Sequence, residues 1–152
     1  MSAPLQLVEQ PLVLRGSLEL IIRRRGNIVE RDVESNLIVN VARQNMAKLL
    51  AGQGTNRSIT QVAVGTNPNP PSPDDTAITT PFIKPINGFS YPTPTSVRFD
   101  FTILESEANG MAIVEFGLLA ADGSLFARRT RSGKVIEKDQ DLQIDGFWTI
   151  LF

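Results

Sequence analysis

Apolar and polar residues alternate along several segments of the chain, and this is the period of a strand with one buried face. The clearest case is 97–104, where every second residue is apolar. Pro85 marks 82–86 as an edge strand, and the apolar segment 142–152 predicts a strand that is central to the sheet or paired with a neighbour. The remaining strand-like segments are separated by turn residues and cover 12–24, 28–33, 59–64, 113–119 and 125–128.

The period changes over residues 36–52, where apolar residues recur at steps of three and four. They form a single apolar stripe made of Ile38, Val41, Ala42, Met46, Leu49 and Leu50. This pattern predicts one amphipathic helix at about Asn40–Ala51. Asn36 or Asn40 is expected to cap its start, and the glycines that follow favour its end.

The segment 113–128 predicts a hairpin that joins two apolar strands. Asp122-Gly123 forms its turn, because Gly accepts a positive φ and Asp tolerates one. Gly117 is predicted to lie where no side chain fits, and Glu115 is interpreted as a solvated or rim position. Three large side chains of the hairpin are expected in the core, namely Phe116, Leu118 and Leu125.

These elements together predict a mainly β fold, an antiparallel β-sandwich or jelly-roll-like domain of about eight strands with the helix packed at one end. A chain of 152 residues fits one such domain. Residues 1–11 contain two prolines and no periodic apolar face, so we expect them to form an N-terminal arm. The single β-rich domain is expected to span residues 12–152.

The composition argues against an enzyme. The chain contains neither His nor Cys, so the usual proton shuttle and thiolate metal ligands are absent. Asp74 and Asp75 could form an acid/base pair or part of a metal site, but such a pair after a proline more often caps the next turn. The acids at 139–145 resemble a calcium loop but lack its glycine and its final bidentate acid. We therefore expect no catalytic, cofactor-binding or metal-binding residues.

Charge gives no reason to expect nucleic acid or a membrane as a partner. Fifteen basic and sixteen acidic residues leave a net charge of −1, and a nearly neutral surface favours association. No apolar run reaches the length that crosses a membrane. The basic run 23–25 lacks interleaved aromatic residues that would stack on bases, so we expect ion pairs across the first hairpin with Glu30, Asp32 and Glu34.

Two segments are candidate partner-binding surfaces. The segment 66–75 cannot form a helix or a central strand, because it contains Pro68, Pro70, Pro71 and Pro73. A loop of this length in a compact domain usually contacts a partner, and we expect it to be mobile until that partner binds. The second is a basic cluster that forms either a solvated strand face or a docking surface for an acidic partner, and it contains Arg128, Arg129, Arg131 and Lys134, with Lys138 nearby.

The pattern Glu115-x-Gly117-Leu118, the Asp122-Gly123 turn and then Leu125-x-Ala127 resembles the small β modules of tailed-phage fibres and baseplates, including the N-terminal tail-collar fibre domain. The order of the other segments is similar over about residues 12–152. The resemblance implies a structural virion protein of a tailed phage or tail-like particle, in the baseplate or at the tail–fibre junction. It would act through multi-copy contacts with other tail, baseplate or fibre proteins, as a homo-oligomer or symmetric assembly. Such a protein is made in the host bacterial cytoplasm and resides in the virion tail.

The alternative function is that of a carbohydrate-binding β-sandwich module. Such a site requires exposed aromatic rings beside carboxylates. The chain has one Trp and one Tyr, Trp148 and Tyr91. Both lie near apolar runs and are expected to be buried, which favours the assembly function over carbohydrate binding.

Overall fold

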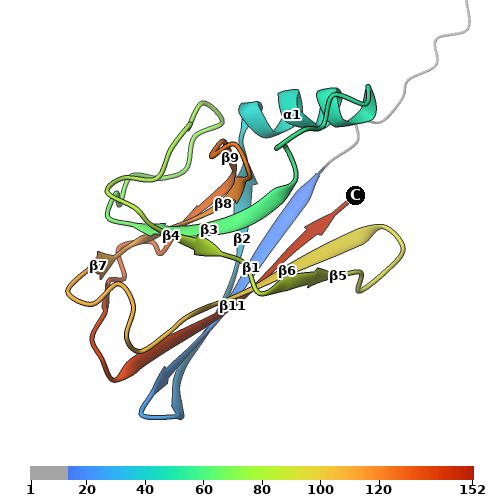
Figure 1. Cartoon of the computed structure of the whole chain (residues 1–152). Helices are drawn as coiled ribbons and strands as arrows, with labels where there is room; N and C mark the ends of the chain where they lie inside the picture. The colour runs from blue at the N-terminus through green and yellow to red at the C-terminus, as the bar shows by residue number, and fades with distance from the viewer. Residues whose placement is uncertain (1–13) are drawn as a thin grey trace, which may run out of the picture.

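The computed structural model describes residues 14–152, and its main feature is a curled antiparallel sheet of nine strands (Figure 1). Strands make up 50% and helix 8% of the structure, so the predicted mainly β class with one helix is confirmed. The sheet contains β1 (Arg15–Arg24), β2 (Asn27–Ile38), β3 (Ile59–Gly65), β4 (Phe82–Pro85), β5 (Gly88–Ser90), β6 (Ser96–Ile103), β8 (Glu115–Ala120), β9 (Leu125–Thr130) and β11 (Leu142–Leu151). A separate pair is formed by β7 (Ala112–Ile113) and β10 (Ile136–Glu137).

The sheet curls into two layers that share β2. This strand pairs with β1 along residues 27–36 and then with β9 at residues 37–38. One layer has the order β2-β1-β11-β6-β5, and the other has the order β9-β8-β3-β4. Phe101 of β6 and Phe116 of β8 meet with ring centroids 6.3 Å apart. The arrangement is sandwich-like, with β4 at one edge and β11 inside its layer, as predicted.

The core lies between these layers, and α1 (Asn40–Leu50) lies at one end of the molecule (Figure 1). Trp148 of β11 is fully buried, and its indole N–H donates to Asn36 Oδ1 at 2.9 Å. The core predicted from the hairpin pattern is confirmed, because at most 1% of the surface is exposed for Phe116, Leu118 and Leu125.

Two glycines allow side chains to pack directly on strand backbone. A Cβ at Gly117 would lie 2.5 Å from Cγ1 of Ile78, so the prediction that no side chain fits there is confirmed. Gly146 is the cross-strand partner of Phe101, whose ring occupies the space that a side chain at Gly146 would need. Larger residues at these positions would displace core side chains.

The helix begins and ends within one residue of its predicted bounds, but the capping prediction is wrong. The N-cap is Val39, and no side chain bonds to the free N–H groups there. Asn36 instead accepts the indole N–H of Trp148. Asn40 donates its backbone N–H to Pro73 O at 2.8 Å, so a neighbouring loop takes the place of a side-chain cap.

The ion pairs of the first hairpin also differ from those expected. The basic run 23–25 does not pair across its own turn but with acids in β11 and just before it. This follows from the sheet order, because β11 lies beside β1 on the side away from β2. The observed pairs, at 3.1 to 3.2 Å, are Arg23–Asp145, Arg24–Asp139 and Arg25–Asp141. The predicted arm, residues 1–11, lies outside the described residues.

Candidate functional site

A buried ion pair lies between β8 and β9, next to the loop of residues 66–75, which we call the proline-rich loop. Arg128 Nε donates to Glu115 Oε1 at 2.9 Å, and neither side chain is more than 1% exposed. The interpretation of Glu115 as a solvated position is therefore wrong. Buried charges of this kind are stable only when their remaining N–H groups and oxygens are also bonded.

The remaining atoms of the pair hold the proline-rich loop at both ends. Arg128 donates from Nη2 to Asn67 O and from Nη1 to Asp75 Oδ2, both at 3.0 Å. Glu115 Oε2 accepts from the backbone N–H groups of Asn67, at 2.5 Å, and Thr79, at 3.2 Å. The two charged side chains therefore fix the start of the loop, its end and the segment that follows.

The acidic pair in the loop holds a turn. Asp75 Oδ2 accepts from Ser72 N at 2.8 Å, and Asp75 N donates to Ser72 O at 3.0 Å. Asp74 Oδ1 accepts from Asn40 Nδ2 at 3.0 Å, which joins the loop to the first turn of α1. The sequence suggested that the pair caps the turn that follows it, but the turn lies at residues 72–75 and includes the pair.

The loop that is held in this way presents prolines to solvent. Pro68, Pro70 and Pro73 are exposed, and Pro71 is half-buried. Proline is apolar, has one fixed backbone angle and lacks an N–H group, so a partner can cover it without leaving an unsatisfied donor. Because the loop is already held, ordering it on binding loses little conformational entropy. This loop is therefore the strongest candidate for a protein-binding site among the described residues.

The predicted outward-facing basic surface is not formed. Arg129 pairs with Asp32 at 2.6 Å, and Arg131 pairs with Glu30 and, at 3.5 Å, with Asp32. These pairs join β9 and the residue that follows it to β2, so the two arginines bridge the junction of the two layers. Lys134 is the exposed member of the cluster. The three others are at most 4% exposed, and they are Arg128, Arg129 and Arg131.

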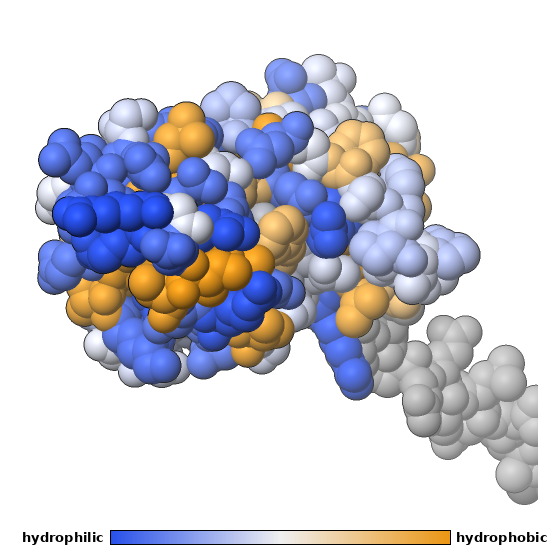
Figure 2. Space-filling view, turned by 90° about the horizontal axis from the view of Figure 1, so that it is seen from below, coloured by the Kyte–Doolittle hydropathy of each residue, from blue (hydrophilic) through white to orange (hydrophobic). Residues whose placement is uncertain are grey.

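Lys134 stands beside a hollow of about 570 Å³ near the β1–β2 turn. The lining combines the exposed apolar residues Val29 and Val135 with the acids Glu30 and Glu137. Figure 2 views the molecule from the side of this turn and shows apolar surface interrupted by hydrophilic residues. A partner contact at Lys134 stays a prediction.

Another buried cation, Lys138, lies near the small sheet. Its Nζ donates to Glu105 O at 3.2 Å, to Asn109 Oδ1 at 2.9 Å and to Asp139 O at 2.8 Å. Burial lowers the pKa of this ammonium group, and the carboxylates of Asp139, Glu105 and Glu107 oppose the shift. The three oxygens occupy its donors, so Lys138 ties two loops together.

Glu107 lies in the same region and pairs with a partly buried lysine. Although burial acts to raise the pKa of its carboxyl group, hydrogen bonds from Lys84 Nζ at 2.6 Å and Leu104 N at 2.8 Å outweigh this effect. The pKa of Glu107 is therefore held below its usual value. This pair stabilises the turn after β6.

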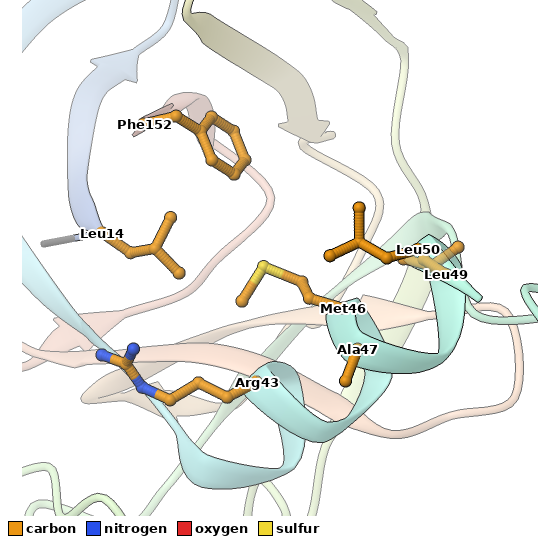
Figure 3. Close-up of a pocket in the computed structure, with 7 residues that line it drawn as sticks. All are labelled: Leu14, Arg43, Met46, Ala47, Leu49, Leu50 and Phe152. Atoms are coloured by element: carbon orange, nitrogen blue, oxygen red, sulfur yellow. The ribbon is translucent and has the colours of Figure 1, made fainter. Parts of the chain in front are cut away.

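An apolar groove of about 600 Å³ lies along the last two turns of α1, and we call it the α1 groove. Figure 3 shows that Leu14, before β1, and Phe152, after β11, both extend toward Met46 on the helix. Leu50 is 91% exposed and Phe152 is 53% exposed. Among residues 14–152, the groove is lined by Leu14, Arg43, Met46, Ala47, Leu49, Leu50 and Phe152.

Within residues 14–152, no three acidic side chains gather in a way that could hold a metal ion. The same residues contain no helix of the length and apolarity needed to cross a membrane. Comparisons with protein-family models, curated proteins and solved structures found no match to the chain. Function is therefore inferred from the geometry of the proline-rich loop together with the sequence resemblance.

Proposed function

We propose that the protein is a structural virion component of a tailed phage or tail-like particle, in the baseplate or at the tail–fibre junction. It acts through multi-copy contacts with other tail, baseplate or fibre proteins. The proline-rich loop supports the proposed protein–protein contacts, because buried charged side chains hold the loop in place and leave its prolines exposed. The resemblance of the hairpin 115–127 to phage modules supports the location in a tail.

The loop suits recognition better than catalysis. Its charged groups are engaged in holding the backbone, since Asp75 bonds Ser72 and Arg128, while Glu115 is buried. A catalytic acid or base must reach a substrate, which the buried Glu115 does not, and the exposed Asp74 is bonded to Asn40. The surface that the loop offers contains three exposed prolines and is held in one shape, which suits a docking surface. We infer that the protein is not an enzyme and needs no cofactor.

A charge placed on the loop tests the contact. Pro70 is exposed, so Pro70→Asp is expected to leave the fold intact and to prevent an apolar partner from covering the loop. Pro92→Asp is the matched control, because it makes the same change at an exposed proline outside the loop. Each variant is expressed with the genes that flank its own, and incorporation into purified particles is measured. We expect loss of incorporation for Pro70→Asp and normal incorporation for Pro92→Asp.

Two parts of the proposal fail separately. Normal incorporation of Pro70→Asp would exclude the loop as the contact but would leave the location in a tail intact. Flanking genes of sugar metabolism in place of tail genes, or purified particles that lack the wild-type protein, would exclude that location whatever the loop variant does.

One observation favours the carbohydrate-binding alternative. The sequence predicts a buried Tyr91, whereas the structure leaves it 70% exposed beside Phe89, which is 63% exposed. The two rings lie 5.9 Å apart at an interplanar angle of 72°. Titration calorimetry against a panel of glycans tests this function. Binding that is lost in Tyr91→Ala would support it, and the absence of any heat with the wild type would exclude it.

A further inference from the structure

The α1 groove is an apolar surface that residues 14–152 leave open. Leu50 at the helix end is 91% exposed, Leu49 is 41% exposed and Phe152 is 53% exposed. Single exposed apolar residues need no explanation, but these three line one groove together with Met46 and Leu14. A groove of about 600 Å³ has room for several side chains of another segment.

The sequence places a suitable occupant at the rim of this groove. Leu14 is part of the lining, so residues 1–13 are attached directly to the groove's edge. Glu9 is the single charged side chain of this segment, and among residues 14–152 Arg43 is the single charged side chain that lines the groove, so the two charges are opposite. The other side chains of the segment are largely apolar and include Leu5, Leu7, Val8, Leu12 and Val13.

We propose that the α1 groove of one copy binds residues 1–13 of a second copy, with residues 5–8 in the groove and Glu9 near Arg43. Thirteen extended residues span at most about 45 Å, which exceeds the roughly 16 Å length of the 11-residue helix α1. A proline favours an extended conformation in the residue before it. By sequence, Pro4 and Pro11 therefore favour an extended segment, which is long enough to reach a second copy.

An exchange between two copies fills both grooves at once. Each segment starts at the rim of its own groove, so two copies that face each other across α1 bring each segment beside the partner's groove. Such a contact uses the same surface on both copies, which is the commonest form of a symmetric dimer. The α1 groove is separate from the proline-rich loop, so the two surfaces can be tested independently.

The absence of cysteine from the chain makes cross-linking specific. Two full-chain variants, Leu7→Cys and Ala47→Cys, are mixed and mildly oxidised, and a disulfide forms only where the two Cβ atoms come within about 4.5 Å. We expect a cross-linked heterodimer that forms at least about tenfold faster than the control pair of Leu7→Cys with Val33→Cys, as an effective concentration raised by binding implies. Val33 is 61% exposed and does not line the groove.

A substitution in the groove tests whether this surface drives the association. Leu50→Glu should fold normally because Leu50 is exposed, and a thermal melt checks this. It should weaken self-association in sedimentation about tenfold or more, since burial of one leucine is worth at least that factor. Val33→Glu makes a matched change outside the groove and should leave self-association unaltered.

Three results would overturn this inference. In the double variant Leu7→Cys/Ala47→Cys, a cross-link within one chain at a yield independent of dilution would exclude a second copy as the occupant. Equal cross-linking at Ala47→Cys and Val33→Cys would exclude the groove as the binding surface. Self-association that survives Leu50→Glu would exclude it as well.

Discussion

The proline-rich loop and the α1 groove lie near opposite ends of α1 and are stabilised in different ways. The loop bonds the first residue of the helix, Asn40, and its backbone is held by the buried pair of Glu115 and Arg128. The groove lies along the last two turns, and Leu50 there has no cover among residues 14–152. The proline-rich loop is therefore ordered by contacts inside the folded chain, whereas the α1 groove requires another segment to cover it.

This difference separates folding stability from association. A buried ion pair adds little net stability, because the loss of hydration offsets much of the attraction, but removing one partner is strongly destabilising. Exposed leucines contribute to binding and little to the fold. Substitutions beneath the loop should therefore change the free energy of unfolding, and substitutions in the groove should change association alone.

The largest expected effect comes from Glu115→Gln. This change leaves the guanidinium of Arg128 buried without its countercharge and should lower the free energy of unfolding by about 3–5 kcal/mol. The control, Glu137→Gln, alters an exposed carboxylate and should stay within about 0.5 kcal/mol. Chemical denaturation measures both variants. Equal free energies of unfolding of the two variants would show that the pair of Glu115 and Arg128 does not hold the loop in place.

Gly117→Val tests how closely the segment after the loop packs on β8. The new side chain would collide with Ile78, and overpacking of this kind lowers stability by about 1–3 kcal/mol. Shortening the neighbour should relieve the collision, so Ile78→Ala should be less destabilising with Val at 117 than in the wild type. Additive effects in this double-mutant cycle, measured by denaturation, would contradict the close packing.

Acid pH should remove the contribution of Glu107 to the free energy of unfolding. Glu107 belongs neither to the proline-rich loop nor to the α1 groove. The folded-state pKa lies below the usual value of 4.5, so the stabilising effect is fully present above 4.5 and is lost as the pH falls through the folded-state pKa. Wild type should exceed Glu107→Gln in stability at pH 6, and the difference should shrink toward zero at lower pH. Denaturation curves at several pH values measure this difference, and a constant difference would contradict the shift.

The smallest effect is expected for Leu50→Ser at concentrations where the protein is monomeric. Because Leu50 is 91% exposed, the free energy of unfolding should change by less than about 0.5 kcal/mol. A clear loss of stability in the monomer would mean that the lone chain already covers the groove. In that case the groove, like the proline-rich loop, would be ordered by contacts within one chain.

The fold could be predicted from the sequence where side-chain periodicity decides the outcome. Alternation of apolar and polar residues placed the strands, and the change of period placed the single helix. The apolar segment 142–152 predicted a strand that is central to the sheet or paired with a neighbour, and the first alternative holds, because β11 lies between β1 and β6. The pattern of the hairpin 113–128 also predicted that Phe116 lies in the core and that no side chain fits at Gly117.

The candidate site could not be predicted, because periodicity does not show whether the second face of a strand is covered. Strands β8 and β9 are buried on both faces, with one face on the core. The proline-rich loop covers the other face, where its Asp75 pairs with Arg128, and Arg128 therefore points to a carboxylate instead of solvent. A usable signal was present, since Glu115 is the single acid in an apolar strand and Arg128 lies on the facing strand.

The predictions of the helix cap and of the ion pairs across the first hairpin failed, because both considered only residues that are close in the sequence. The N–H group of Asn40 at the helix start donates to Pro73 O, and the arginines at 23–25 bond acids from the far end of the chain. Sequence neighbours compete with such distant partners, and the order of strands in the sheet decides between them. This order is not contained in the pattern of any single segment.

The central claim is that the buried pair orders the proline-rich loop before any partner binds. Amide hydrogen exchange in the free protein measures this at Asn67 and Thr79, which donate to Glu115, and at Asp75, which donates to Ser72. We predict slow exchange at all three amides in the wild type, and much faster exchange in Glu115→Gln under conditions where the sheet stays protected. Exchange of these amides in the wild type at the rate of an unstructured chain would contradict the claim and support a loop that is mobile until its partner binds.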